Sequence, residues 1–368
     1  MSTDLEIAKG TCYPIFAFEV AQAIDLDQAE RRLFTGAERQ TVKQKRRAPA
    51  SFEYRPAPLR VAREAEEQGL GEYRTSSGIE FVLYDFGAIS VSYAVPLTGP
   101  LTRLPALAYA LWGHEGLQRD ARRHVERLLE DLGSAAIRPR IADFVEDYSI
   151  FEIEAFTAPS DAAALWTDQA PTVAQILRAE LHALSQQEIS DATGSRLSFG
   201  LNDATFIDTD AALVFDREGD DVRAVLEFAN TQLLEMRFLD QQLDGTLERA
   251  YETLLRRPER PWALGSYGAE LRRLARLQLD GAILFEQVTN ALKLVGEQFL
   301  ARVYSLASRR FHLAAWDASI SRKLQTIDGI YAKLADRSAS RRMEVLEWII
   351  IALIAVSLAV SAAAALFH

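Results

Sequence analysis

Alternating apolar residues mark three extended segments in the first 220 residues of the chain. Residues 79–95 follow a period of two, and large apolar residues of the later part fall on one face: Ile89, Val91, Tyr93 and Val95. Residues 147–156 alternate in the same way, and residues 195–216 do so less regularly. Helical patterns cover about 116–132 and about 172–188. Strands and helices mixed with short connections predict an α+β fold, a single mixed α/β domain.

From residue 221 onward the pattern is helical. Apolar residues of the first helix step alternately by four and three: Val222, Leu226, Ala229, Leu233, Met236, Leu243, Leu247, Ala250 and Leu254. A sustained 3.5-residue period is typical of a coiled-coil seam. Pro258 and Pro261 then end the helix, because proline cannot continue the hydrogen-bond ladder.

Two further helices follow, with apolar stripes from Phe285 to Leu306 and from Trp316 to Leu334. The proline break predicts that the first two helices form an antiparallel hairpin, which could serve as a stalk. The pattern leaves open whether the seams close within one chain or between chains. It also leaves open whether Asp240, the polar interruption of the first seam, sets the register or faces water.

The last apolar run, from Trp348 to Phe367, contains no charged residue. A helix of about 20 residues is about 30 Å long, which matches the hydrocarbon core of a bilayer. A buried core helix is the alternative, but such helices rarely run this long without a charge. The pattern therefore predicts one C-terminal transmembrane helix, with these anchor residues: Trp348, Ile349, Ile350, Ile351, Leu353, Ile354, Val356, Leu358 and Val360.

Charges next to this run predict its orientation. Arg341 and Arg342 precede it, Glu347 lies at the junction with Trp348, and His368 alone follows. By the positive-inside rule, the N-terminal part is expected on the cytoplasmic side of the inner membrane, as a single-pass, tail-anchored protein inserted after synthesis. Small residues four apart within the run would permit close approach of two spans, or are simply filler.

These patterns divide the chain into four parts: an N-terminal tail (1–10), a mixed α/β domain (11–220), a helical hairpin or stalk (221–340) and a transmembrane anchor (341–368). Residues 38–68, rich in charge, are interpreted as a surface excursion or linker.

Composition narrows the class of protein. The formal net charge of −11 argues against a general or sequence-specific nucleic-acid binder, because phosphate contacts need a surplus of Lys and Arg. Cys12 is the only cysteine, which excludes an internal disulfide and a cysteine-based zinc site. The acidic N-terminus has the character of neither a secretory signal nor a mitochondrial transit peptide.

Candidate chemistry is confined to one acidic cluster, which comprises Glu146, Asp147, Glu152 and Glu154. On a strand, Glu152 and Glu154 share a face, so a carboxylate pair or a metal site is conceivable, and a solvated strand face is the alternative. Asp203, Asp208 and Asp210 lack the glycine and glutamate of a calcium loop and are interpreted as polar turns. The chain shows no histidine pair at zinc spacing, no phosphate-binding loop and no nucleophile elbow. No catalytic, cofactor-binding or metal-ligating residue is therefore assigned, and we expect a non-enzyme without a cofactor.

Leu346, Glu347 and Trp348, which lead directly into the apolar run, resemble the C-terminal signature of the family named for "required for meiotic nuclear division". The segment FVLYDFGAISVSY resembles an aromatic-rich strand of that family, and the helical region from 301 to 348 is similar to its bacterial members. Where eukaryotic members carry a tryptophan-glycine step, this chain has residues 90–94, which favours a bacterial relative.

The resemblance implies a single-span membrane protein that forms homo-oligomers. Mitochondrial relatives are associated with synthesis of organelle-encoded proteins, through tethering of ribosomes near the inner membrane. A protein or ribosomal partner is therefore expected, and a link to translation or to membrane and division processes is an analogy only. The family has no established catalytic residues to carry over.

The leading hypothesis is a tail-anchored, oligomeric scaffold that recruits a partner at the cytoplasmic face of a lipid bilayer. The competing hypothesis is a membrane-tethered enzyme with a carboxylate or metal site between Glu146 and Glu154. A structural subunit of a larger membrane complex is a third possibility. A scaffold predicts exposed, scattered carboxylates, whereas an enzyme predicts carboxylates that converge in a pocket with perturbed pKa values.

Overall fold

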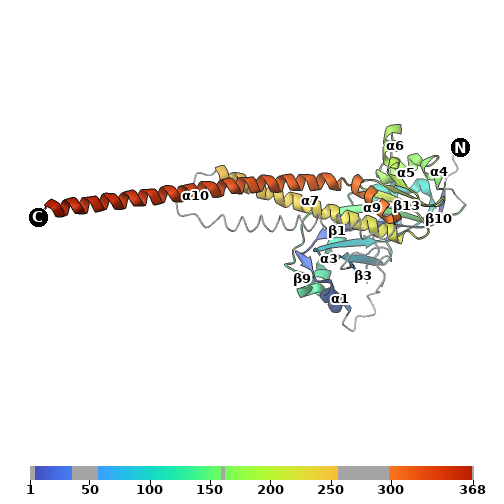
Figure 1. Ribbon diagram of the computed structural model, residues 1–368. Helices are drawn as coiled ribbons and strands as arrows, with labels where there is room; N and C mark the ends of the chain where they lie inside the picture. The colour runs from blue at the N-terminus through green and yellow to red at the C-terminus, as the bar shows by residue number, and fades with distance from the viewer. Residues whose placement is uncertain (1–4, 35–56, 159–161, 256–297, 367–368) are drawn as a thin grey trace. The chain divides into compact units, whose positions relative to one another are not determined.

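A computed structural model describes residues 5–34, 57–158, 162–255 and 298–366 (Figure 1). In addition, the side chains of 253–255, 334–346, 352 and 355–366 lie outside the described residues. The protein has a mixed α/β N-terminal sheet domain and a C-terminal helical region, as the patterns predict. The chain divides into two compact units, 1–238 with 284–316, and 239–283 with 317–368. This division differs from the predicted boundary at 220, because the first part of a long helix belongs to the sheet domain.

The first unit is built around a nine-stranded sheet with the path β11-β12-β13-β10-β1-β7-β6-β3, and β8 also pairs with β1. All pairs in it are antiparallel except β10 with β13. Its strands are β1 (Glu6–Glu19), β3 (Leu59–Glu64), β6 (Gly78–Leu83), β7 (Ala88–Tyr93), β8 (Val95–Pro100), β10 (Val145–Phe156), β11 (Arg196–Leu197), β12 (Ala204–Ile207) and β13 (Ala211–Phe215). Two small two-stranded sheets pair β2 (Ala23–Ile24) with β9 (Ala136–Ile137) and β4 (Gly69–Leu70) with β5 (Tyr73–Arg74).

Strand β1 is the centre of the sheet, although the sequence pattern does not predict it. It begins at Glu6, inside the segment 1–10 that the pattern assigns to a tail. Pro14, which lacks a backbone N–H, normally argues against a central strand. One edge of β1 pairs with β10 along most of its length, while the other edge pairs with β8 up to Cys12 and with β7 from Ile15. Pro14 therefore lies between the part of β1 that pairs with β8 and the part that pairs with β7.

The alternating segment 79–95 forms the hairpin of β6 and β7. The turn between them depends on Gly87, which has a φ of +106°. A Cβ at this position would lie 2.0 Å from the carbonyl oxygen of Ala21, so a side chain cannot be accommodated. The predicted face of Ile89, Val91 and Tyr93 is confirmed as apolar core.

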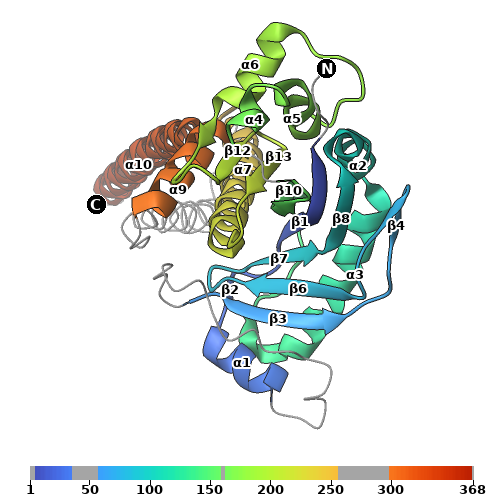
Figure 2. The same ribbon diagram turned by 90° about the vertical axis from the view of Figure 1, so that its right-hand side faces the viewer.

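Helices cover the apolar face of this sheet (Figure 2). They are α1 (Leu26–Phe34), α2 (Leu104–Leu111), α3 (Glu115–Leu132), α4 (Ala163–Trp166), α5 (Ala170–Leu177) and α6 (Gln186–Gly194). Helix α3 confirms the predicted helix at 116–132. The single helix predicted at 172–188 is wrong, because Ala179 adopts a φ of +51° and Ser185 caps a new helix by accepting from the Glu188 N–H.

The charged segment 38–68 is not wholly a linker. Its residues up to 56 lie outside the described part, but Leu59–Glu64 forms the edge strand β3. Val61 is fully buried on the apolar face, while Arg60 packs on the other face of the sheet. Strand β3 is short and contains few apolar residues, so composition alone suggested a surface excursion.

The opposite face of the sheet packs against α7 (Asp220–Leu255), whose first part belongs to the same unit. From Ala224 to Met236 every residue of α7 is buried. The ring of Phe228 lies 6.0 Å from that of Tyr84 of the sheet and 6.3 Å from that of Tyr304 in α9 (Gln298–Arg310). This part of α7 is therefore buried on all sides, not only along a heptad stripe.

In the second unit, Asp240 has a defined partner within the chain. Its carboxylate lies 2.8 Å from Nζ of Lys323 and accepts a hydrogen bond from the Ser319 hydroxyl. Lys323 also pairs with Asp244 at 2.6 Å. Both partners of Asp240 belong to α10 (Leu313–Leu366), so at this level the seam closes within one chain. Pro258, Pro261 and the stripe from Phe285 to Val295 lie outside the described residues.

Helix α10 contains the predicted span. Among the residues that the structure describes, no helix carries an apolar stretch long enough to cross a membrane. The anchor residues Val356, Leu358 and Val360, together with Arg341, Arg342 and Leu346, are among the side chains outside the described set. The described anchor residues are 50–71% exposed on the helix: Trp348, Ile349, Ile350, Ile351, Leu353 and Ile354. Glu347 is also exposed.

Candidate functional site

The face of the sheet that packs against α7 carries buried polar and charged side chains. In β7, Ser90 and Ser92 alternate with the apolar residues and therefore face α7. Helix α7 contributes Arg223 and Glu227, one turn apart, both at least nine-tenths buried. These residues place ionic chemistry inside the fold.

The charges form an alternating chain across the sheet. Arg60 lies 3.1 Å from Glu80 and 3.3 Å from Glu227. Glu227 also accepts a 2.7 Å hydrogen bond from the Ser90 hydroxyl. On its other side, Glu80 lies 3.5 Å from Arg223. Each buried charge thus has an opposite charge next to it, as burial away from water requires.

Arg223 is the last member of this chain and is only partly satisfied. Its guanidinium donates to Asp220 at 2.5 Å and lies 4.1 Å from the centre of the Tyr13 ring. Its Nε is 3.8 Å from Oε2 of Glu152, and neither of these two buried atoms has a hydrogen-bond partner in the described part of the chain. Burial raises the pKa of Tyr13 and raises the pKa of Glu152 to about 7.

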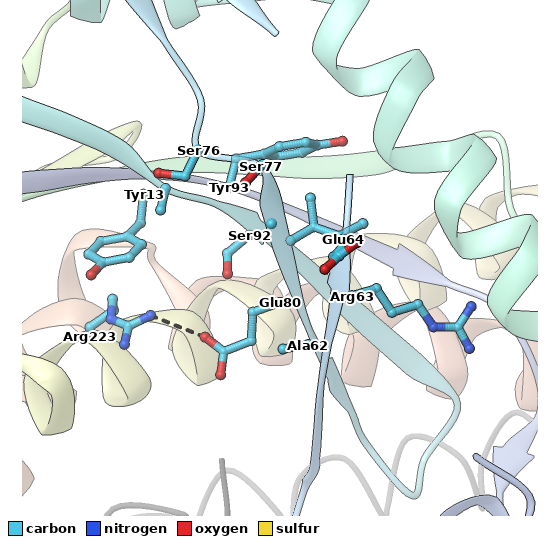
Figure 3. Close-up of a pocket in the computed structure, with 13 residues that line it drawn as sticks. Tyr13, Ala62, Arg63, Glu64, Ser76, Ser77, Glu80, Ser92, Tyr93 and Arg223 are labelled. Atoms are coloured by element: carbon cyan, nitrogen blue, oxygen red, sulfur yellow. Dashed lines mark ion pairs between the residues drawn. The ribbon is translucent and has the colours of Figure 1, made fainter. Parts of the chain in front are cut away.

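A pocket of about 470 Å³ opens beside Arg223 (Figure 3). Strands β1, β3, β6 and β7 and the start of α7 supply its walls. Its polar lining includes Tyr13, Ser76, Ser77, Glu80, Ser92 and Arg223. Figure 3 shows Arg63 directed away from this group, where it pairs with Asp131 at 2.6 Å.

A second ion pair joins the same strand to the same helix. Glu146 of β10 is bound by Arg237 of α7, whose NH1 lies 2.6 and 2.9 Å from the two carboxylate oxygens. The Arg237 guanidinium also lies 4.6 Å from the centre of the Phe144 ring. Burial raises the pKa of Glu146 to about 7, against the opposing effect of Arg237.

The two ion pairs are separated by the same distance along β10 as along α7. Glu146 and Glu152 are six residues apart on β10, a rise of about 20 Å. Arg223 and Arg237 are 14 residues apart on α7, a rise of about 21 Å. The pairs therefore fasten α7 to β10 at two points.

The predicted acidic cluster does not converge. Glu146 and Glu152 are buried but bind different arginines, Glu154 pairs with Lys9, and Asp147 is exposed. The interpretation of the whole cluster as a solvated strand face does not fit the two buried members. Among the described residues, no group of three or more His, Cys, Asp or Glu is placed to hold a metal ion.

The three aspartates interpreted as polar turns also differ in their surroundings. Asp203 accepts from the N–H groups of Phe199 and Gly200, as a turn residue does. Asp208 instead is fully buried, 2.9 Å from Arg178 and 2.7 Å from Arg310. These pairs hold the turn before β13 to α9 and to the loop after α5.

Sequence reasoning missed the arginines and the pocket. Arg223 and Glu227 lie four apart on a helix, a spacing that is usually found on a solvated face. A signal was available in α7 itself, where polar residues are interspersed with apolar ones on every face between 222 and 236.

The chain was compared with known protein families, curated proteins and solved structures. Residues 9–221, more than half of the chain, match the model of a family described as "Uncharacterized protein MJ0711, N-terminal domain". The chain belongs to this family. A member from Methanocaldococcus jannaschii, itself named an uncharacterized protein, is 23% identical over 235 residues, which are 62% of this chain and 70% of that protein.

No solved structure matches the chain. The matches establish membership of an uncharacterised family and confirm neither the resemblance to the meiotic nuclear division family nor a bacterial origin. The family match ends at residue 221, so it includes the strands of the pocket but not Arg223.

Proposed function

We propose that this protein is a single-span, membrane-anchored scaffold whose sheet domain recruits a macromolecular partner. The observation that carries the proposal is the row of large, exposed apolar side chains from Trp348 to Ile354 on α10. Successive residues of a helix point in different directions, so this segment is apolar on all sides. Such a surface requires an apolar environment, and a bilayer supplies one.

The sequence beyond this segment supports the same environment, because no charged residue follows Glu347 before His368. Arg341 and Arg342 precede it, and such residues favour the cytoplasmic side of a membrane. The sheet domain would then face the cytoplasm. Self-association through the span remains part of the proposal, whereas the Asp240–Lys323 contact supports a seam closed within the chain.

The test is membrane extraction of the full chain expressed in cells. We expect the native protein to stay with membranes after alkaline carbonate washing and to be released by detergent. Val356→Lys combined with Leu358→Lys should move it to the soluble fraction, because a charge at the centre of a span costs about 3 kcal/mol. The matched control is Val356→Leu with Leu358→Val. A native chain released by carbonate would refute the anchor.

Partner recruitment is tested on the same material. Mild-detergent purification, mass determination and identification of co-purifying macromolecules should yield a discrete homo-oligomer with a protein or ribosomal partner. A monomer without a partner would refute the scaffold, even if the anchor is upheld.

A membrane-tethered enzyme is the second candidate, favoured by the pKa of about 7 at both Glu146 and Glu152. A side chain with a pKa near 7 suits general acid–base chemistry. Their separation of about 20 Å along β10 speaks against a shared reaction centre. Glu152→Gln should leave partner recruitment unchanged if the protein is a scaffold.

A further inference from the structure

We propose that the pocket beside Arg223 binds vicinal hydroxyl groups of a neutral, polyhydroxylated small molecule, either a free sugar or the ribose of a nucleoside. The inference is independent of the membrane anchor and of partner recruitment. It rests on the polar groups that line the pocket, on the serine hydroxyls among them and on the balance of charge of the lining.

The first observation is an unused hydroxyl. Ser92 is 5% exposed, and its side chain makes no hydrogen bond to any residue that the structure describes. Figure 3 shows this hydroxyl directed toward Glu80 inside the pocket. Ser76 and Ser77 line the same pocket and likewise make no side-chain hydrogen bond within the described part of the chain. These three hydroxyls are therefore available to donate to or accept from a ligand in the pocket.

The second observation is a donor and an acceptor held side by side. NH1 of Arg223 lies 3.5 Å from Oε2 of Glu80, which is longer than a good hydrogen bond. A ligand hydroxyl can donate to the carboxylate and accept from the guanidinium at the same time. Two hydroxyls on adjacent carbons would use this pair together with Ser92.

Charge selects against ionic ligands. An anion attracted to Arg223 would also approach Glu80, and a cation attracted to Glu80 would approach Arg223. The charged residues that line the pocket are two arginines and two glutamates, so neither sign dominates its lining: Arg63, Arg223, Glu64 and Glu80. A neutral ligand avoids both repulsions.

The pocket is also suitably sized and rigid. Its volume of about 470 Å³ falls in the range of small-molecule sites. The Tyr13 ring, 4.1 Å from the Arg223 guanidinium, and the Asp220 hydrogen bond hold the guanidinium in place. A prearranged donor loses less conformational entropy on binding.

The test is ligand titration of the full-length protein at pH 7 in a polyoxyethylene detergent, which contains no sugar. The probes are glucose, ribose and adenosine, with glucosamine and gluconate as positively and negatively charged analogues. Calorimetry or saturation-transfer NMR should show at least one neutral probe binding at least about tenfold more tightly than both charged analogues. Preference for glucose points to a free sugar, and preference for adenosine points to a nucleoside.

Ser92→Ala should weaken binding of the preferred probe about tenfold, the effect of one hydrogen bond. Ser190→Ala, at an exposed position of α6, is the matched control and should bind as the native chain does. If Ser92→Ala fails to fold, Ser76→Ala provides the same test from the pocket wall.

Three results would overturn the proposal. The first is that no neutral probe binds. The second is tighter binding of either charged analogue. The third is an affinity within twofold of the native value for the folded serine variant. Each of these leaves the carbonate and co-purification results unaffected, so the pocket and the scaffold can fail separately.

Discussion

The two faces of the nine-stranded sheet bury different kinds of side chain. The face covered by α1, α2, α3 and α5 is an apolar core, in which Phe81, Phe151 and Ile153 are fully buried. The face covered by α7 buries Arg223, Glu227 and Glu152 as well as apolar residues. Because buried charges are stable only with partners in defined positions, the second face specifies where α7 lies rather than how strongly it is held.

The two faces also differ in how many of their polar atoms are left without a hydrogen-bond partner. The apolar face leaves little hydrogen-bonding capacity unused; the Tyr93 hydroxyl, for example, donates to Asp120 at 2.9 Å. On the α7 face, Nε of Arg223 and Oε2 of Glu152 have no hydrogen-bond partner among the residues that the structure describes, and the pocket opens beside Arg223. Four substitutions or titrations would break or sharpen this contrast.

The largest effect is expected on the apolar face. Phe151→Ala should reduce the free energy of unfolding by about 4 kcal/mol, because it removes a fully buried ring at the centre of the sheet. Urea unfolding of the full chain in detergent measures this loss. Lys333→Ala, a surface change in the helical region, should shift the midpoint only slightly. A loss below about 1 kcal/mol would contradict a close-packed core.

Removing a single charge from the α7 face comes next. Arg223→Met should cost about 3 kcal/mol, because Glu80 and Glu152 lose a buried partner. Adding Glu152→Gln should restore part of the loss, since the second change removes an uncompensated carboxylate. The same unfolding experiment decides it. The Glu152→Gln single variant completes the cycle, and a double-variant loss equal to the sum of the two single losses would mean that the two side chains do not interact.

A smaller effect is expected from Ser90→Ala. The change removes the 2.7 Å hydrogen bond to the buried Glu227 carboxylate, which keeps its ion pair with Arg60. We expect the free energy of unfolding to fall by about 1.5 kcal/mol. Ile89→Val, the adjacent residue on the apolar face, serves as the comparison and should cost about 1 kcal/mol. A neutral outcome for Ser90→Ala would show that water replaces the hydroxyl.

A change of pH perturbs the buried carboxylates without any substitution. Burial raises the pKa of Glu146 and Glu152 from 4.5 to about 7, so the folded state binds more protons than the unfolded state between these values. Stability contributed by these groups is complete below about pH 4.5 and is lost as pH rises toward 7, at up to about 1.4 kcal/mol per pH unit for each group. Glu146→Gln combined with Glu152→Gln should flatten this slope in unfolding measurements from pH 5 to 7.5. An unchanged slope would assign the pH dependence to other groups.

Local patterns in the sequence determined much of the fold. Period-two alternation identified the β6–β7 hairpin and β10, and helical periodicity identified α3 and, through a 3.5-residue repeat, α7. The uncharged run after Glu347 is likewise a property of the sequence alone. Strand β1 was not predicted, because Pro14 argues against a central strand as long as the two strands that share one edge of β1 are unknown.

The candidate site was decided by tertiary structure. Tyr13, Glu80, Ser92 and Arg223 come from four elements far apart in the chain, and no spacing relates them. An Arg and a Glu four residues apart on a helix look the same whether they face water or a sheet. Only the packing of α7 on the sheet determines that Arg223 and Glu227 are buried, and hence that their charges need partners within the fold. The sequence determined the strands and helices whose apolar residues repeat at a fixed interval, and the three-dimensional contacts determined which polar side chains are removed from water.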